Sequence, residues 1–350
     1  MSPQPLPDNW TDDAGWLAQA IDPRARLIRL VRMDQGSYRA ASFLDDRVLQ
    51  QGLEMLLCSL DEAIAGSASV VRDDARWIFH IGHVGSTLVA RLLGELDGVL
   101  SIREPRALRD LGFVDAPERA NVANGLRRLM ARTFAPDQLA LVKATSFVSE
   151  LAPLLVAKGA PTLFMFASPA NYVASILAGE NSVKELAALH DIRAGRLRGR
   201  GIELRDFDRS EAHRAAAAWA CEMTSLETAA EALGDAGILW ADFDVMLVDM
   251  PAWLERCAAH FAFAAPKGRV DELIAGPLMR RYSKALEYDY SPSLRADLLD
   301  EAARRHRSDI AAALAALAEA AKAHPMLARA LRRAEQESTN VSHPATADRS

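Results

Sequence analysis

Short apolar runs alternate with stretches of helical spacing through the middle of the chain. Each run has the length of a buried strand, and an amphipathic pattern with the period of a helix follows it. Strand then helix, repeated, predicts a mostly parallel five-stranded sheet with helices on both faces, and so an α/β core over Arg76–Asp242. The runs are Trp77–Ile81, Val99–Ile102, Leu139–Val142, Thr162–Phe166 and Ile238–Ala241.

The segment before the core predicts a small extension that packs on it. Residues 1–22 have the pattern of a loose lead-in with one short amphipathic piece at Trp16–Ile21. Arg26–Met33 alternates apolar and basic residues, which predicts a strand, and Ala40–Leu44 is its expected hairpin partner. Leucines at helical spacing predict a helix over Val48–Ile64.

These patterns divide the chain into four parts. Residues 1–70 form the N-terminal strand and helix extension, and residues 71–265 form the α/β core. Residues 266–335 are expected to form a C-terminal lid and helices, because Leu294–Arg333 is rich in alanine and leucine at helical spacing. Residues 336–350 are polar and without periodicity, which predicts a disordered tail.

Composition and charge narrow the functional classes. The 41 basic and 47 acidic residues give a net charge of −6, which disfavours a general nucleic-acid binder but permits a local basic site for a small anion. No apolar run reaches the roughly 18 residues of a membrane span, and no signal-peptide pattern opens the chain. Three cysteines, Cys58, Cys221 and Cys257, have neither disulfide-framework nor metal-site spacing. We therefore expect a cytoplasmic protein.

The first core run ends in a glycine-rich turn with the sequence HIGHVGST over residues 80–87. Glycines let backbone N–H groups approach an anion closely, and the following helix adds unpaired N–H groups and the positive end of its dipole. The turn follows the carboxyl end of a strand, where α/β sheets bind their ligands. It therefore predicts a phosphate cradle, made of Gly82, His83, Gly85, Ser86 and Thr87.

This turn differs from the nucleoside-triphosphate loop G-x-x-x-x-G-K-[ST], in which a lysine reaches the β- and γ-phosphates. Ser86 stands in place of that lysine, and the loop is shorter. Hydrolysis of ATP or GTP is therefore disfavoured. A cofactor with a single 5′-phosphate type of group needs less positive charge at this position.

The turn resembles the 5′-phosphosulfate loop of sulfotransferases that use 3′-phosphoadenosine 5′-phosphosulfate (PAPS). That family has a lysine or arginine, a variable residue, and then Gly-Ser/Thr-Thr/Ser; His83 occupies the basic position, and residues 85–87 match the rest. The resemblance covers Arg76–Phe263 and is closest to an uncharacterised bacterial sulfotransferase-like branch. It implies a P-loop-type sheet in which the core strands lie in the order second, third, first, fourth, fifth.

Other stretches follow the order of that family. Residues 99–105 resemble the second strand, which in several branches ends in a carboxylate before a proline, and this makes Glu104 the candidate base. Residues 141–146 resemble the third strand, whose terminal Lys143 is the candidate contact to the sulfonate. His83 is the third catalytic candidate, as a hydrogen-bond donor to the leaving oxygen. The alternatives are an ion pair of Glu104 with Arg103, Arg106 or Arg109, a surface position for Lys143, and a packing role for His83.

The family binds the 3′-phosphate of its cofactor with an arginine and a serine, and here only the serine is present. Ser175 matches, but Ala167 stands at the arginine position, so a strong charge-assisted contact is lost. Another cation is needed if PAPS binds, and Arg281 is the first candidate. The other candidates lie in an expected loop (Arg193, Arg196, Arg198, Arg200) and near the expected cofactor-covering segment (Arg280, Lys284).

The resemblance implies a PAPS-dependent sulfotransferase that acts on a hydroxyl or amine of a small molecule or glycan. We expect no metal, because no histidine has a ligand-like spacing to carboxylates, and we expect His80 to be a buried structural residue. Two alternatives remain open: a non-catalytic binding protein on a degenerate sulfotransferase scaffold, and another P-loop transferase such as a small-molecule kinase. No motif in the sequence identifies the acceptor molecule. The oligomeric state is also open, and a homo-oligomer is one of the alternatives.

Overall fold

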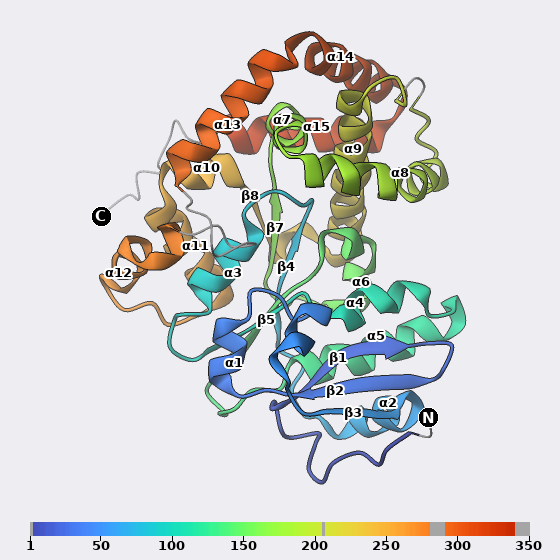
Figure 1. Ribbon diagram of the computed structural model, residues 1–350, viewed down its shortest axis with the longest axis vertical. Coiled ribbons are helices and arrows are strands. Elements are labelled where there is room, and N and C mark those ends of the chain that lie inside the picture. The colour runs from blue at the N-terminus through green and yellow to red at the C-terminus, as the bar shows by residue number, and fades with distance from the viewer. Residues whose placement is uncertain (1–2, 205–206, 281–290, 340–350) are drawn as a thin grey trace.

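A parallel five-stranded sheet forms the centre of the molecule (Figure 1). The structure is a computed structural model that describes residues 3–204, 207–280 and 291–339. The sheet order is β5-β6-β4-β7-β8, which confirms both the predicted fold class and the expected order of the core strands. Its strands are β4 (Arg76–His80), β5 (Val99–Arg103), β6 (Leu139–Lys143), β7 (Thr162–Phe166) and β8 (Ile238–Asp242).

Helices cover both faces of this sheet, so the strands are apolar on both sides. Every residue of β7, TLFMF, is buried, as a central parallel strand requires. Helices α3 and α11 lie on one side of the sheet, and α6 and α9 lie on the other (Figure 1). The helices of the core are α3 (Ser86–Leu93), α4 (Arg106–Asp110), α5 (Ala116–Met130), α6 (Ala152–Leu155), α7 (Pro169–Leu177), α8 (Glu180–Gly199), α9 (Glu211–Leu233), α10 (Phe243–Val248), α11 (Met250–Phe261) and α12 (Arg269–Ala275).

A small antiparallel sheet replaces the predicted N-terminal hairpin. Strand β2 (Leu27–Arg32) pairs with β1 (Trp16–Asp22) and β3 (Met55–Ser59), so the amphipathic piece at residues 16–21 is a strand. The expected partner segment, residues 40–44, contains instead the end of α1 (Gln35–Ala40). The Asp34 side chain caps α1 by accepting a hydrogen bond from the Ser37 N–H, so a helix begins soon after β2 in place of a hairpin turn.

The predicted helix over residues 48–64 is wrong, because three short elements occupy it. They are the 3-10 helix η1 (Asp46–Gln51), strand β3, and helix α2 (Leu60–Gly66). Ser59 ends the strand and caps α2 through the Glu62 N–H, which starts a new helix inside the leucine-rich stretch. The leucines are therefore distributed over the 3-10 helix, the strand, the second helix and the coil between them.

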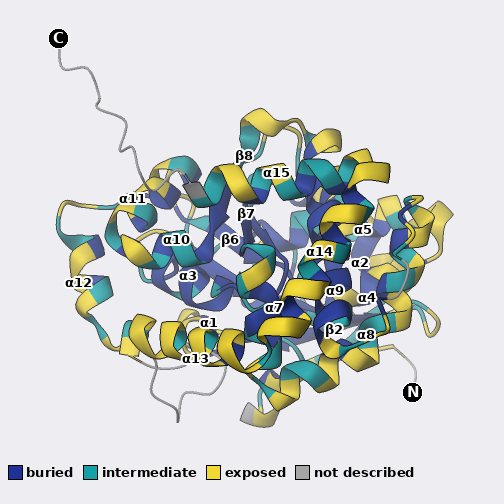
Figure 2. Cartoon of the chain, turned by 90° about the horizontal axis from the view of Figure 1, so that it is seen from above, coloured by how far each residue is buried: buried dark blue, intermediate teal, exposed yellow. Residues whose placement is uncertain are grey.

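The C-terminal prediction of helices over residues 294–333 is confirmed by α13 (Pro292–Arg305), α14 (Arg307–Ala323) and α15 (Pro325–Thr339). Helix α15 extends past residue 336, the expected start of the tail. Arg329 and Arg333 both reach the buried carboxylate of Glu227, which joins α15 to α9. Exposed positions gather on the outer helices α13 and α14, whereas the sheet lies in the buried interior (Figure 2). Within the described residues, no helix is long and apolar enough to cross a membrane.

Candidate phosphate-binding and transfer site

The glycine-rich turn runs from the end of β4 to the start of α3 through three residues with positive φ. These are Gly82 at 86°, His83 at 57° and Gly85 at 61°. Left-handed residues in a turn can direct successive backbone N–H groups toward one side, an arrangement that binds anions in other proteins. Among the described residues, no acceptor is found for the backbone N–H groups of residues 84–87. The turn therefore presents donors at the N-terminus of α3, as the sequence predicts.

Two hydroxyls at the start of α3 add to these donors. Ser86 and Thr87 are each only 4% exposed, because the first turn of α3 is packed into the core. In the described part of the chain, neither hydroxyl has a hydrogen-bond partner. Two unpaired hydroxyls beside a row of backbone N–H donors are suited to binding an anion.

Close packing fixes the backbone of the turn from two sides. The ring of Phe243, directly after β8, lies against Gly85 so closely that a β-carbon there would overlap the ring. Ser146, three residues after the end of β6, lies 3.5 Å from the position that a β-carbon of Gly82 would occupy. Glycine is therefore required at position 85 by both its φ and its neighbour.

Two of the catalytic candidates, Glu104 and Lys143, form an ion pair at the ends of neighbouring strands. The backbone supports the pair, because the Glu104 N–H donates to the Lys143 carbonyl at 2.8 Å. Lys143 is fully buried, which corrects the surface alternative, and the side chain of Glu104 is 14% exposed. The buried cation of Lys143 and the carboxylate of Glu104 therefore lie together at the edge of the sheet where parallel strands bind ligands.

None of the three arginines considered as partners of Glu104 pairs with it within the described residues. Arg103 is buried and turns the other way, donating to the Ala41 carbonyl at 3.0 Å, and burial lowers its pKa to about 9. Arg106 pairs with Asp46 and Asp110. The three arginines lie within five residues of Glu104 in the sequence, which favours them as partners. The backbone turn after β5 instead directs the Glu104 side chain toward Lys143 at the end of β6.

The backbone of Glu104 is strained. Its φ is 54°, and Pro105 follows it. A side chain with a β-carbon seldom adopts this left-handed conformation, and a following proline disfavours helical conformations further. Strain of this kind persists where the surroundings enforce it, and it concentrates at functional sites.

His80 joins the turn to the ion pair. Its Nδ1 accepts a hydrogen bond from the Gly82 N–H at 3.1 Å, and its Nε2 lies 3.0 Å from the Ala144 carbonyl. The same Nε2 lies 4.0 Å from Oε1 of Glu104. His80 is 5% exposed, as the sequence predicts for a buried residue, but its contacts place it at the centre of the site. Its position at the start of the glycine-rich sequence, two residues before Gly82, is the signal that could have found it.

His83 occupies the turn itself and is half-buried. Its ring lies edge-on to the ring of Tyr172, with 6.4 Å between the centroids. Burial raises the pKa of Tyr172, so its hydroxyl stays neutral and the side chain contributes packing but no charge beside His83. The structure thus places His83 beside α7.

The expected contacts to the 3′-phosphate, one directly after β7 and one on α7, lack a cation. Ala167 is 1% exposed, and its carbonyl accepts a hydrogen bond from Trp219 Nε1 at 2.9 Å. Ser175 lies on α7, where its hydroxyl donates to the Tyr172 carbonyl at 2.8 Å. Ser175 is partly exposed. Of the arginine and serine that the resemblance implies for the 3′-phosphate, only this serine hydroxyl is therefore available.

The expected loop that carries four candidate arginines is a helix, α8. Arg193 pairs with the buried Glu222, and Arg196 and Arg200 pair with Glu150, so these three cations are engaged in the packing of α8. Arg280 donates to the Ala275 carbonyl at 3.4 Å. Arg281 and Lys284 lie outside the described residues.

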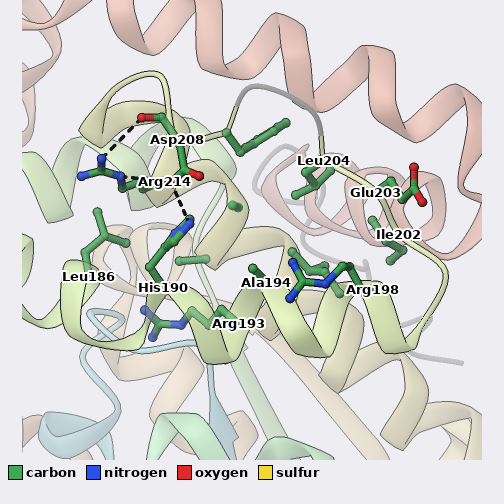
Figure 3. A pocket seen from close by; sticks show the side chains of 14 residues that line it. Leu186, His190, Arg193, Ala194, Arg198, Ile202, Glu203, Leu204, Asp208 and Arg214 are labelled. Carbon is green, nitrogen blue, oxygen red and sulfur yellow. Dashed lines mark hydrogen bonds and ion pairs between the residues drawn. The ribbon is translucent and has the colours of Figure 1, made fainter.

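A cavity of about 480 Å³ opens between α8 and α9. Arg193 and Arg198 contribute to its wall, and His190 and Arg214 both reach Asp208 across it (Figure 3). None of the described residues that line it belongs to the glycine turn or to the Lys143–Glu104 pair. Arg193 and Arg198 of α8 therefore line this cavity, and Arg196 contacts η4 (Ser146–Leu151).

An arginine that belongs to no motif in the sequence lies close to the turn. Arg295 of α13 donates to Oδ1 of Asp244 at 2.9 Å, and its guanidinium lies 5.1 Å from the centre of the Phe243 ring. Asn171 of α7 donates to the other oxygen of Asp244, also at 2.9 Å. Arg295 lies 51 residues after Asp244 in the sequence, so only folding brings α13 to this position.

The carboxylates at the end of β8 are engaged in the packing of the chain. Asp242 caps α10 through the Asp244 N–H and accepts a hydrogen bond from Ser338, and burial raises its pKa. Asp244 holds Asn171 and Arg295. Within the described residues, no group of three or more histidine, cysteine or acidic side chains could hold a metal ion.

Comparison with known proteins gives a structural likeness at low sequence identity. No protein-family model matches the chain, and no curated protein matches it. A sulfotransferase domain from the curacin biosynthetic pathway is a similar solved structure, with a TM-score of 0.38 and 12% sequence identity. The match covers 65% of this chain and 89% of that domain. What this chain does must therefore be inferred from its own side chains.

Proposed function

We propose that the chain is a sulfotransferase that moves a sulfuryl group from PAPS to a hydroxyl or amine of a small molecule or glycan. One observation carries the proposal: His80 links an anion-binding turn to a buried Lys143–Glu104 pair. Transfer of a group between oxygens requires hydrogen-bond donors that bind an anion, a cation that stabilises negative charge, and a carboxylate that accepts a proton. The geometry of these side chains supports the proposal independently of the structural likeness.

Each part of the site has a role in this reaction. PAPS supplies the sulfuryl group, and the backbone N–H groups of residues 84–87 with the Ser86 and Thr87 hydroxyls bind its 5′-phosphate. Lys143 donates to the sulfonate oxygens, where negative charge has to be stabilised. Glu104, a carboxylate in its ion pair, accepts the proton of the acceptor hydroxyl as the new oxygen–sulfur bond forms and the bond to the phosphate breaks.

His83 and Ser175 complete the proposed cofactor site. His83 donates to the leaving oxygen from the turn, and Ser175 contributes its hydroxyl to the 3′-phosphate. Because Ala167 offers no charge, the 3′-phosphate needs a cation from the C-terminal part of the chain, and we assign Arg281 to this role. Arg295 is the second candidate, because it reaches α7 and the turn through Asp244 and Phe243.

Isothermal titration tests the cofactor class. Purified protein is titrated with 3′,5′-adenosine bisphosphate, adenosine 5′-phosphate and Mg-ATP. We expect the bisphosphate to bind more tightly than the 5′-phosphate, and the Ser86→Ala/Thr87→Ala variant to bind it about ten-fold or more weakly. Ser69→Ala, at an exposed serine, is the matched control.

Each outcome of the titration has a definite meaning. Bisphosphate binding that requires Arg281 or Arg295 supports a working 3′-phosphate site. Selective binding of Mg-ATP would overturn the sulfotransferase in favour of a kinase. No binding of any of the three nucleotides would overturn it in favour of a non-catalytic scaffold protein.

A further inference from the structure

His80 holds two parts of the site together through the two nitrogens of one ring. Nδ1 accepts from the Gly82 N–H at 3.1 Å, and Nε2 lies 3.0 Å from the Ala144 carbonyl. Gly82 begins the anion-binding turn, and Ala144 directly follows Lys143 at the end of β6. One imidazole therefore ties the turn to the strand that carries the buried lysine.

These partners fix the tautomer of the ring. A nitrogen that accepts from an N–H group carries no proton, so Nδ1 is unprotonated. Nε2 then carries the proton and donates it to the Ala144 carbonyl, which can only accept. The neutral ring thus has one donor and one acceptor, and each of them has a backbone partner.

Two charged groups lie beside this ring. Oε1 of Glu104, at the end of β5, is 4.0 Å from Nε2, and the same oxygen pairs with Lys143. His80 is only 5% exposed, so bulk water has little access to replace its hydrogen bonds. The ring therefore contacts the turn and the ends of two neighbouring strands, in a place where a lost contact is not easily compensated.

We propose that His80 is a positioning residue that sets the anion-binding turn relative to the Lys143–Glu104 pair. This inference rests on the proposed function and adds a residue that the sequence analysis treated as structural only. Group transfer depends on the placement of the bound anion against the cation and the base, and a shift of about 1 Å can cost about 100-fold in rate. The contact to Gly82 carries the positioning, because it is the one that reaches the turn.

Two substitutions separate the two hydrogen bonds of the ring. The side-chain oxygen of asparagine in His80→Asn can take the place of Nδ1 and accept from Gly82. The amide nitrogen of glutamine in His80→Gln can take the place of Nε2 and donate to Ala144. Both variants lose packing, so their melting temperatures report the structural cost, whereas only His80→Gln lacks the acceptor for the turn.

The first readout is independent of any ligand. Hydrogen exchange of the Gly82 amide is measured in the full-length protein and in both variants. We expect protection in the wild type and in His80→Asn, and exchange about ten-fold faster in His80→Gln. Equal exchange in the two variants would overturn the inference.

The second readout is the affinity for 3′,5′-adenosine bisphosphate. We expect His80→Asn to bind within about three-fold of the wild type and His80→Gln to bind about ten-fold more weakly. Affinities that fall together with the melting temperature in both variants would show a structural role only and overturn the inference. Failure of the wild type to bind would instead count against the proposed function, and the exchange measurement would still decide the role of His80.

Discussion

The ring of Phe243 lies directly against the α-carbon of Gly85 and leaves no space for a side chain there. Gly85 also has a φ of 61°, so two independent constraints act on one position of the turn. We expect Gly85→Ala to destabilise the protein and to abolish bisphosphate binding, because the loop must move away from the ring. Chemical denaturation and titration calorimetry measure the two effects.

Gly52 is a matched control for this substitution. Its φ is 66°, but nothing lies within 4 Å of the position of its β-carbon. Gly52→Ala should therefore cost only the backbone strain, about 1 kcal/mol, and leave binding unchanged. A similar loss of stability in both variants would contradict a role for the contact with Phe243.

The Lys143–Glu104 pair should show strong coupling. Lys143→Met and Glu104→Gln each break the ion pair and keep one of its charges in a buried or nearly buried position, so each should cost about 2–4 kcal/mol of unfolding free energy. The double variant should cost less than the sum of the two, because both charges of the pair are removed together. Urea denaturation of the four proteins gives the coupling energy, and simple additivity would mean that the pair contributes nothing.

Arg295 should hold α13 against the core. Arg295→Met removes the donor to Asp244 and should cost about 1–2 kcal/mol, with faster amide exchange across residues 292–305. Arg304→Met, at an exposed position of the same helix, is the control and should change neither quantity. Unchanged exchange in Arg295→Met would show that the contacts of α13 with α7 suffice.

His260 should make stability depend on pH in the acidic range. Burial lowers its pKa below 6.5, and its Nε2 lies 3.1 Å from the Thr162 carbonyl. Below pH 6.5 the unfolded chain binds the proton more readily than the folded one, so stability falls as the pH falls toward the lower folded pKa. His260→Gln keeps a donor for Thr162 and removes the titration.

Denaturation at about pH 7.5 and about pH 5.5 tests this expectation. The wild type should lose more unfolding free energy between the two values than His260→Gln does. Equal losses in the two proteins would show that other groups account for the acid sensitivity. The comparison cancels the histidines and carboxylates that the two proteins share.

Local patterns were sufficient for most of the core. The apolar runs correspond to the five parallel strands, and the glycine turn has the positive φ angles and the available backbone donors that its residues predict. Patterns failed in the N-terminal extension, where leucines at helical spacing are distributed over a 3-10 helix, a strand and a second helix. Spacing alone does not distinguish these cases, because caps such as Ser59 decide where each element begins.

Residue patterns were enough to specify the parallel core, the glycine-rich turn, and Glu104 and Lys143 as candidates at strand ends. The pairing of these two side chains, the link from His80 to the turn and the contact of Arg295 with Asp244 emerged only in the folded chain. A strand or a turn is specified by residues close together in the sequence. These contacts instead join segments from different strands and helices, whose side-chain directions depend on packing across the whole sheet.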